Sequence, residues 1–251
     1  MNTNLQSTKL DNKVIFITGS SKGIGLAIAK SLKELTNSII IISGTAPAAQ
    51  YEMMGYFDRT FLDYNQVFYY PMNLKNAESI NFVYDNLIEK FGKIDILINN
   101  AGIGIFKPFD DIYLDDLSNT MEVNFIAPVK LIKLALPSMI KNENGMVVNI
   151  SSIAHFEKFK GSSIYAASKS ALTNFSKVLR EEVRSKNIKI MNVFPGATKT
   201  DIWSKESLDK YGEKMINVNE LGYVIANNIV MSYQYDLMIE DITIRPTNGD
   251  L

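Results

Sequence analysis

Tyr165 and Lys169 carry the side chains in this sequence that are best suited to moving a proton. They stand four residues apart, so on a helix the phenol and the ammonium lie on one face and reach the same space. A free phenol has a pKa of about 10 and exchanges protons poorly near neutrality, but a neighbouring cation favours its ionised form. About one such pair is expected by chance in a chain of this composition, so the pair alone decides nothing.

Two further polar residues stand where they could join this pair. Ser152 lies thirteen residues before Tyr165, just after the apolar run Met146–Ile150, and Asn124 lies in the helical stretch before that run. Together the four residues favour acid–base chemistry. The alternative is a capped helix that carries a tyrosine without function.

A glycine-rich stretch near the start of the chain, Thr-Gly-x-x-x-Gly-x-Gly over Thr18–Gly25, could bind a dinucleotide. The four apolar residues before it, Val14–Ile17, predict a strand buried on both faces, and the residues after it predict a helix. Glycines at such a turn allow close approach of a pyrophosphate, and the helix N-terminus supplies free N–H groups. An ordinary glycine-rich turn is the alternative.

Composition narrows the class of protein. The 251 residues are 46% hydrophobic and 21% charged with a net charge of −1, which is typical of a globular chain without a basic block for nucleic acid. Cysteine is absent, and we predict no metal site. Met1–Asn12 is polar, unlike a signal peptide, and no uninterrupted apolar run reaches the roughly 20 residues of a membrane helix. We expect one cytoplasmic domain over residues 1–251, without a nucleic-acid or membrane partner.

Short apolar runs alternate with helical stretches along the chain. Strands are expected at 14–17, 38–43, 67–70, 94–99, 146–150, 188–194 and 237–244. Helices are expected at 23–35, 46–64, 77–91, 111–141 (bent at Pro128 and Pro137), 163–185 and 220–231. The alternation predicts an α/β fold: a Rossmann-type, doubly wound parallel sheet of about seven strands with helices on both faces.

Polar or glycine residues follow almost every predicted strand. In a parallel sheet, ligands bind beyond the carboxyl ends of the strands, where the strand order reverses. The residues expected at that edge are Thr18-Gly19, Ser43-Gly44-Thr45, Asn73, Asn99-Asn100, Ser151-Ser152 and Pro195-Gly196. The sequence therefore predicts a binding site at this edge.

These motifs together resemble the short-chain dehydrogenase/reductase family, NADP-dependent type, over nearly the whole chain from Lys13 to Ile244. Their order and spacing are jointly more specific than any one motif. The matching motifs are Thr18–Gly25, Asn99–Gly102, Val123-Asn124, Ser152, Tyr165–Lys169 and Pro195-Gly196 with Thr200.

The resemblance implies an oxidoreductase that moves a hydride between a nicotinamide cofactor and a carbonyl or alcohol. Tyr165 would be the general acid/base at the reacting oxygen, and Lys169 would favour its phenolate and hold the nicotinamide ribose. Ser152 would hydrogen-bond the reacting oxygen, and Asn124 would position a water that relays protons to Lys169. His155, the only histidine, is expected to flank the substrate pocket, because Tyr165 already serves as the acid.

Residues near the glycine loop favour NADP(H) over NAD(H). NAD sites usually place an acidic residue about 20 residues beyond the loop, where this chain has Ser43-Gly44-Thr45. Lys22 stands where NADP-dependent members of the family often carry a basic residue; a solvated surface lysine is the alternative. Asn73-Leu74 departs from the family's usual Asp at the adenine but keeps a hydrogen-bond acceptor. The expected cofactor contacts are Gly19, Ser21, Lys22, Gly23, Ile24, Gly25, Ser43, Thr45, Asn73, Leu74, Asn100, Ala101, Gly102, Tyr165, Lys169, Pro195, Gly196, Thr198 and Thr200.

Two segments are expected to cover the substrate, the loop 153–163 and a lid over 201–218. An apolar, partly aromatic pocket suits a small or hydrophobic ketone, or a 3-hydroxy acid. Simple packing of the lid is the alternative for each side chain. The side chains concerned are Phe156, Phe159, Trp203, Leu208 and Tyr211, with Ile103 and Phe106 from the turn after the fourth strand.

Two other functions stay open. The first is a 3-oxoacyl-(acyl-carrier-protein) reductase, although such reductases typically end in a Gly-Gly segment, unlike the tail 242–250. The second is a non-catalytic NADP-sensing scaffold; such proteins commonly lose the tyrosine or the lysine, and this chain keeps both. The resemblance also implies a homo-oligomer, dimer or tetramer, built through the helices at 111–141 and 163–185.

Overall fold

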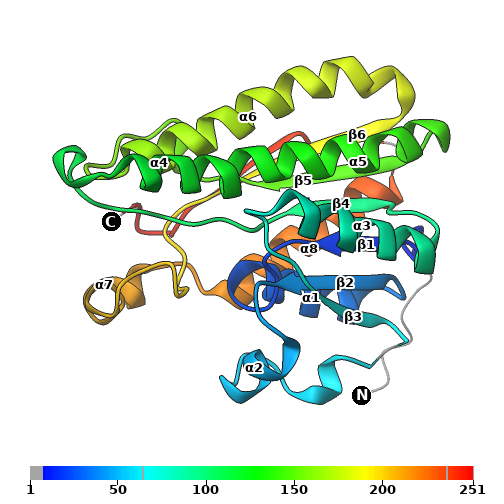
Figure 1. Cartoon of the computed structure of the whole chain (residues 1–251), viewed down its shortest axis with the longest axis horizontal. Helices are drawn as coiled ribbons and strands as arrows, with labels where there is room; N and C mark the ends of the chain where they lie inside the picture. The colour runs from blue at the N-terminus through cyan, green and yellow to red at the C-terminus, as the bar shows by residue number, and fades with distance from the viewer. Residues whose placement is uncertain (1–7, 64, 236, 251) are drawn as a thin grey trace.

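The structure, a computed structural model, describes residues 8–63, 65–235 and 237–250. Its centre is a seven-stranded sheet in the order β3-β2-β1-β4-β5-β6-β7, with every neighbouring pair parallel (Figure 1). The predicted α/β, Rossmann-type sheet is confirmed. The strands are β1 (Val14–Ile17), β2 (Ile39–Gly44), β3 (Val67–Pro71), β4 (Ile96–Asn99), β5 (Gly145–Ile150), β6 (Ile188–Pro195) and β7 (Asp241–Ile244).

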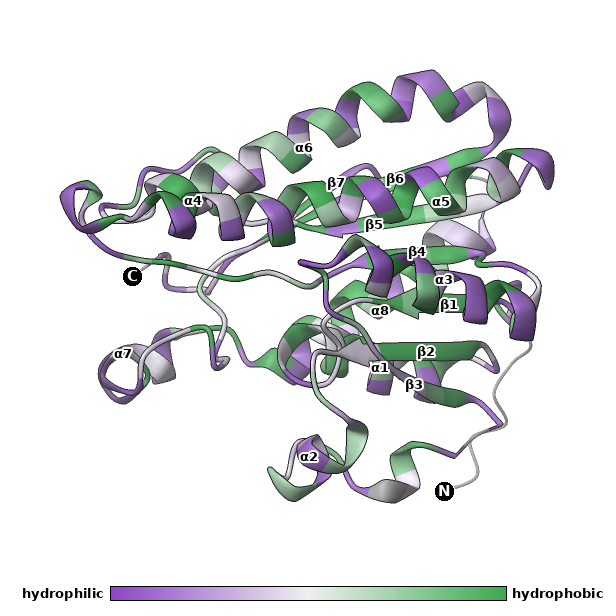
Figure 2. Ribbon diagram, viewed as in Figure 1, coloured by the Kyte–Doolittle hydropathy of each residue, from purple (hydrophilic) through white to green (hydrophobic). Residues whose placement is uncertain are grey.

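Helices cover both faces of the sheet, as right-handed crossovers between parallel strands require. Successive β1 residues point to opposite faces, Ile15 and Ile17 to one core and Val14 and Phe16 to the other. The strands are therefore hydrophobic along their length, whereas the helices alternate between polar and apolar residues (Figure 2). One face carries α1 (Gly23–Leu35) and α8 (Val218–Gln234); the other carries α3 (Ala77–Phe91), α5 (Ala127–Lys141) and α6 (Ser163–Val183).

The best-defined helix ends follow from local chemistry. α1 and α3 span the predicted residues 23–35 and 77–91. The Asn76 side chain accepts the Ser79 N–H at the start of α3, and Gly92, with φ of +77°, ends it in a left-handed conformation.

The helix predicted over 46–64 is wrong. Only α2 (Ala48–Met53) forms there, followed by a 3₁₀ turn at Arg59–Phe61; Tyr64 lies outside the described residues. Gly55, with φ of +75°, interrupts the helical path. The helix in this segment, α2, is therefore short, and it lies at the same end of the sheet as α7 (Lys205–Tyr211) (Figure 1).

The predicted strand 237–244 is also too long, since only Asp241–Ile244 pairs with β6. The helix predicted over 111–141 forms from Leu114 to Lys141 as α4 (Leu114–Met121), a π-helical turn and α5. Among the described residues this is the one helix long and apolar enough, by length and composition alone, to cross a membrane. Of its apolar window, 44% is buried within the protein.

Candidate active site

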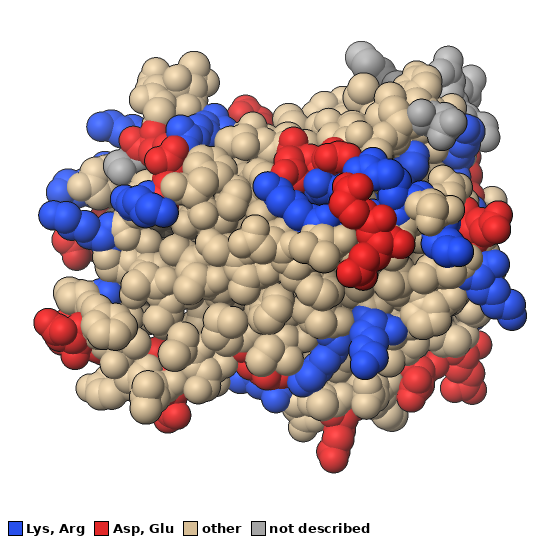
Figure 3. Space-filling view, turned by 90° about the horizontal axis from the view of Figure 1, so that it is seen from above, with Lys and Arg blue, Asp and Glu red and all other residues tan. Residues whose placement is uncertain are grey.

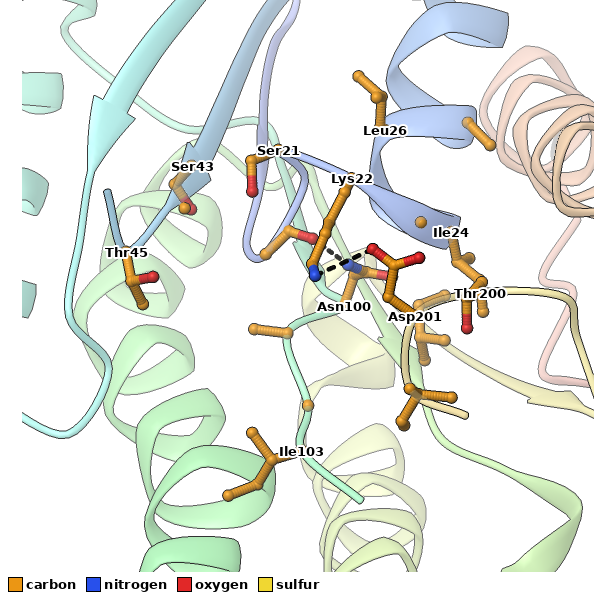
Figure 4. A pocket seen from close by; sticks show the side chains of 18 of the residues that line it. Ser21, Lys22, Ile24, Leu26, Ser43, Thr45, Asn100, Ile103, Thr200 and Asp201 are labelled. Carbon is orange, nitrogen blue, oxygen red and sulfur yellow. Dashed lines mark hydrogen bonds and ion pairs between the residues drawn. The ribbon is translucent and has the colours of Figure 1, made fainter. Parts of the chain in front are cut away.

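The sheet carries a cavity of about 770 Å³ where the strand order reverses between β1 and β4 (Figure 4). The volume lies in the usual range for a bound small molecule or cofactor. The predicted residues that line it are Gly19, Ser21, Lys22, Gly23, Ile24, Ser43, Thr45, Asn73, Leu74, Asn100, Ala101, Gly102, Tyr165, Lys169 and Thr200. The predicted residues outside that lining are Gly25, Asn124, Ser152, Pro195, Gly196 and Thr198.

The glycine loop follows β1 and packs tightly against the segment after β4. Gly19 has a φ of +59°, and a Cβ there would lie 2.7 Å from the Cα of Ala101. A Cβ on Gly25 would collide with the Asn100 amide. The Thr18 hydroxyl accepts the N–H groups of Asn100 and Ala101, each at 3.1 Å. Glycine is required because two backbone segments meet beside the cavity.

Tyr165 and Lys169 lie in the first turns of α6 and both line the cavity. The Lys169 Nζ donates a hydrogen bond of 2.8 Å to the Ile150 carbonyl at the end of β5 and lies 5.8 Å from the centre of the Tyr165 ring. Lys169 is only 4% exposed. The end of β5 and the start of α6 therefore hold phenol and ammonium side by side.

Burial sets the protonation of both groups. Loss of solvent raises the pKa of the Tyr165 phenol, and a hydrogen bond with Ser152 lowers it by less. Burial also lowers the pKa of Lys169 to about 8. Burial, rather than the charge of Lys169, thus governs the phenol in this structure. At neutral pH Tyr165 keeps its proton, as an acid must.

Asn124 lies in the π-helical turn between α4 and α5 and is fully buried. Its Nδ2 donates to the Ile103 carbonyl at 2.9 Å and to the Ser168 hydroxyl at 3.0 Å, and its Oδ1 accepts the Ile103 N–H at 2.9 Å. A Cβ on Gly102 would lie 3.3 Å from the Lys169 Nζ and 3.4 Å from the Asn124 Oδ1. Asn124 therefore fixes the backbone that faces Lys169.

Ser152 begins the turn after β5, and its Oγ accepts a backbone N–H of that turn at 3.1 Å. The same side chain acts to lower the pKa of the Tyr165 phenol. The His155 ring lies between Phe156 and Phe194, with ring centres 4.4 and 4.2 Å away, and its Nδ1 is 2.9 Å from the Ser152 carbonyl. The histidine thus packs the loop that carries Ser152.

The segment after β6 brings an aromatic stack beside Tyr165. The Trp203 Nε1 donates to the Thr198 carbonyl at 3.0 Å, and the indole stacks on Phe106 with ring centres 5.5 Å apart and planes 8° from parallel. Phe106 lies 5.3 Å from the Tyr165 ring. Thr198 is 4% exposed and forms an isolated parallel β-bridge with Ile216. This bridge fixes the backbone to which Trp203 is hydrogen-bonded.

Lys22 is paired with a carboxylate of the segment after β6. Its Nζ lies 3.1 Å from the Oδ2 of Asp201 (Figure 4). The Tyr56 hydroxyl donates to the same oxygen. The Tyr56 hydrogen bond and the Lys22 charge lower the pKa of Asp201, although partial burial acts against them. Three further residues line the cavity but belong to none of the sequence motifs described above: Tyr51, Tyr56 and Asp201.

The family model described as short chain dehydrogenase matches residues 13–211. The chain belongs to the short-chain dehydrogenase family. It is 33% identical, over 82% of its length and 84% of the relative's, to a 3-oxoacyl-[acyl-carrier-protein] reductase of Aquifex aeolicus. It is 30% identical, over 77% of its length and 74% of the relative's, to an NADP-dependent 3-hydroxy acid dehydrogenase of Schizosaccharomyces pombe. A solved metagenomic short-chain oxidoreductase in complex with NADP is 25% identical, with a TM-score of 0.78 over 96% of this chain and 100% of that one.

As a short-chain dehydrogenase the protein is an oxidoreductase, and the nicotinamide cofactor of that family fits the residues present. Gly19 and Gly23, both with φ of +59°, line the cavity without a side chain at either position. Gly23 opens α1, whose first N–H groups are free to meet a pyrophosphate. Lys169 and Thr200 border the same cavity.

Proposed function

We propose that this short-chain dehydrogenase uses NADP(H) to interconvert a carbonyl compound and its alcohol. The observation that carries the proposal is one continuous cavity lined both by the glycine loop, through Gly19 and Gly23, and by the pair Tyr165 and Lys169. A dinucleotide held on the loop would extend toward the pair. The cofactor supplies or takes the hydride, and the side chains of this chain handle the proton and the orientation of the substrate.

The side chains divide that work by their protonation states. In reduction the Tyr165 phenol, kept protonated by burial, gives its proton to the carbonyl oxygen while Ser152 hydrogen-bonds the same oxygen. Lys169 stays charged below pH about 8 and stabilises the phenolate that remains. Alcohol oxidation needs the phenolate at the outset, so higher pH favours that direction.

The assignment of NADP(H) rests on the residues at the end of β2 and on Lys22. Ser43 and Thr45, which carry hydroxyl groups, line the cavity where a carboxylate would repel a 2′-phosphate. Lys22 supplies a positive charge on the same cavity. The relative from S. pombe and the metagenomic structure both carry NADP in their names, which supports the same choice.

The substrate side of the cavity favours an apolar carbonyl compound. Ile103 and Ile202 line the cavity, and the Phe106–Trp203 stack stands beside Tyr165. We therefore propose that the substrate is a small or hydrophobic ketone or, in the oxidative direction, a 3-hydroxy acid. A 3-oxoacyl thioester is the second candidate, favoured by the 33% identity to the Aquifex reductase.

The test is a substrate panel with purified protein, followed by nicotinamide absorbance. Small ketones, aromatic ketones, 3-hydroxy acids and a 3-oxoacyl thioester are offered with either cofactor. We expect turnover of at least one class, with a higher kcat/KM for NADPH than for NADH. A preference for NADH contradicts the cofactor assignment. Tight NADPH binding without turnover of any compound supports a sensing scaffold instead.

A homo-oligomer built through α4, α5 and α6 is part of the proposal. This face has a broad central area without charged side chains (Figure 3). Such an area is typical of a surface that another copy covers. Sedimentation at the 28.2 kDa of one chain would contradict it. The exposed apolar side chains on these helices include Leu114, Leu117, Ile126 and Val178.

A further inference from the structure

We propose that Tyr51 and Asp201 set how strongly the cavity prefers a 2′-phosphorylated dinucleotide: Tyr51 donates to the phosphate, and Asp201 opposes it by holding Lys22. The inference rests on the NADP(H) assignment above. It adds two residues with opposite effects on one group of the cofactor.

Hydroxyl groups converge at the end of β2, around Gly44. Tyr51, on α2, lines the cavity and is 8% exposed, and its hydroxyl lies 3.4 Å from the Thr45 Oγ1. A Cβ on Gly44 would lie 2.5 Å from the Ser21 Oγ and 2.8 Å from the Tyr69 hydroxyl. The absence of a side chain at Gly44 is what lets these hydroxyls approach one another.

This cluster suits a phosphate group. Hydrogen bonds from a neutral hydroxyl to a phosphate oxygen are charge-assisted and therefore strong. Burial raises the pKa of Tyr51, but its hydrogen bonds with Ser21 and Thr45 outweigh burial and leave the pKa below its ordinary value. A more acidic phenol is a better donor. Tyr69 differs from Tyr51 because its hydroxyl already donates to the Ala46 carbonyl and lies outside the cavity lining.

Lys22 is held by other groups in this structure. Its ammonium pairs with Asp201 and lies 5.4 Å above the Tyr56 ring, and Tyr56 itself donates to Asp201. These contacts join the glycine loop, the segment after α2 and the segment after β6. A phosphate that approaches Lys22 meets the like charge of Asp201 and has to displace it. The carboxylate therefore weakens the site for the 2′-phosphate.

The test measures binding of ADP-ribose and of 2′-phospho-ADP-ribose by calorimetry. The two ligands differ only in the phosphate, and neither carries nicotinamide, so catalysis does not enter. We expect Asp201→Asn to tighten 2′-phospho-ADP-ribose about two- to fivefold, since exposed ion pairs are weak. We expect Tyr51→Phe to weaken it about tenfold, because a hydrogen bond to a charged group is lost. Binding of ADP-ribose should change less than twofold in both variants.

Two matched variants control for charge and for packing. Asp209→Asn removes an exposed carboxylate from α7, outside the cavity lining. Tyr69→Phe removes a hydroxyl from the same cluster that does not line the cavity. Neither should alter the ratio of the two affinities. If Asp209→Asn changes this ratio as much as Asp201→Asn does, the role of Asp201 is refuted. If Tyr69→Phe changes it as much as Tyr51→Phe does, the role of Tyr51 is refuted.

The outcomes separate this inference from the function on which it rests. If the unaltered protein binds both ligands equally, the assignment of NADP(H) fails and this inference fails with it. If it prefers 2′-phospho-ADP-ribose and Asp201→Asn leaves that preference unchanged, Asp201 does not compete for Lys22. Equal weakening of both ligands by Tyr51→Phe assigns Tyr51 to packing rather than to phosphate recognition.

Discussion

Replacement of Lys169 by Met should stabilise the cofactor-free protein while removing its activity. Burial lowers the pKa of Lys169 from 10.5 to about 8, and a shift of this size corresponds to about 3 kcal/mol of unfavourable free energy in the folded state. Loss of the hydrogen bond to the Ile150 carbonyl costs about 1 kcal/mol. Methionine has a similar length and packs adaptably, so the net expected gain at pH 7 is about 2 kcal/mol.

The gain has a defined pH dependence. Because the folded pKa lies below the unfolded one, the unfolded chain binds more protons between pH 8 and 10.5, and unfolding becomes harder as pH rises through that window. The penalty of Lys169 is therefore complete below pH 8 and disappears toward pH 10.5. Lys169→Met should melt about 4–8 °C above the parent at pH 7 and should lose that advantage at high pH.

Urea and thermal unfolding of both proteins at pH 7 and pH 10 measure this difference. Lys133→Met is the control, since Lys133 is exposed on α5 and should give a difference near zero at both pH values. A Lys169→Met variant less stable than the parent at pH 7 would refute the reasoning. So would a gain that persists unchanged at pH 10, because it would then have a source other than the buried charge.

Three further predictions test other parts of the site. Tyr165→Phe should lower kcat/KM by about 10²–10⁴-fold with NADPH binding retained, and unimpaired turnover would exclude Tyr165 as the acid. Gly19→Ala should lower the urea midpoint and abolish dinucleotide binding, because its Cβ would lie 2.7 Å from the Ala101 Cα. Gly55→Ala is the control: Gly55 also has a positive φ, but its Cβ would meet nothing within 4 Å, so the free energy of unfolding should fall by only about 1–2 kcal/mol. Phe106→Ala should raise the KM for an apolar ketone about three- to tenfold with NADPH affinity unchanged, and an equal effect on both would place Phe106 in the cofactor site.

The features that the sequence predicts best are those that depend on a local residue pattern or on a motif. The unbroken apolar runs of β1 and β2 need burial on both faces, and the structure provides it. α3 ends where Gly92 permits a left-handed residue. Motif order also locates the Tyr165–Lys169 pair, because its helix must follow β5 and its face must meet the cavity.

The parts that the sequence does not predict depend on long-range packing. Tyr56 and Asp201 stand 145 residues apart, and no spacing rule relates them. The helical pattern at Tyr51, Met54 and Phe57 reflects a short helix and a turn: Tyr51 and Phe57 are buried, whereas Met54 is 57% exposed. The π-helical turn around Asn124 is equally unexpected, since its residues continue an ordinary helical pattern.

A row of polar residues, buried on β4 to β6 and exposed on β7, explains how the sheet aligns the residues of the site. Asn99, Asn149, Asn192 and Asp241 stand opposite one another on β4 to β7. Asn99 Nδ2 donates to Asn149 Oδ1 at 2.8 Å, and Asn192 Nδ2 donates to Asp241 Oδ1 at 3.0 Å. A slip of one residue between these strands would break both side-chain hydrogen bonds in a buried setting, which is unfavourable. The row therefore holds the strand ends level, so that the segments after β4, β5 and β6 reach the cavity together.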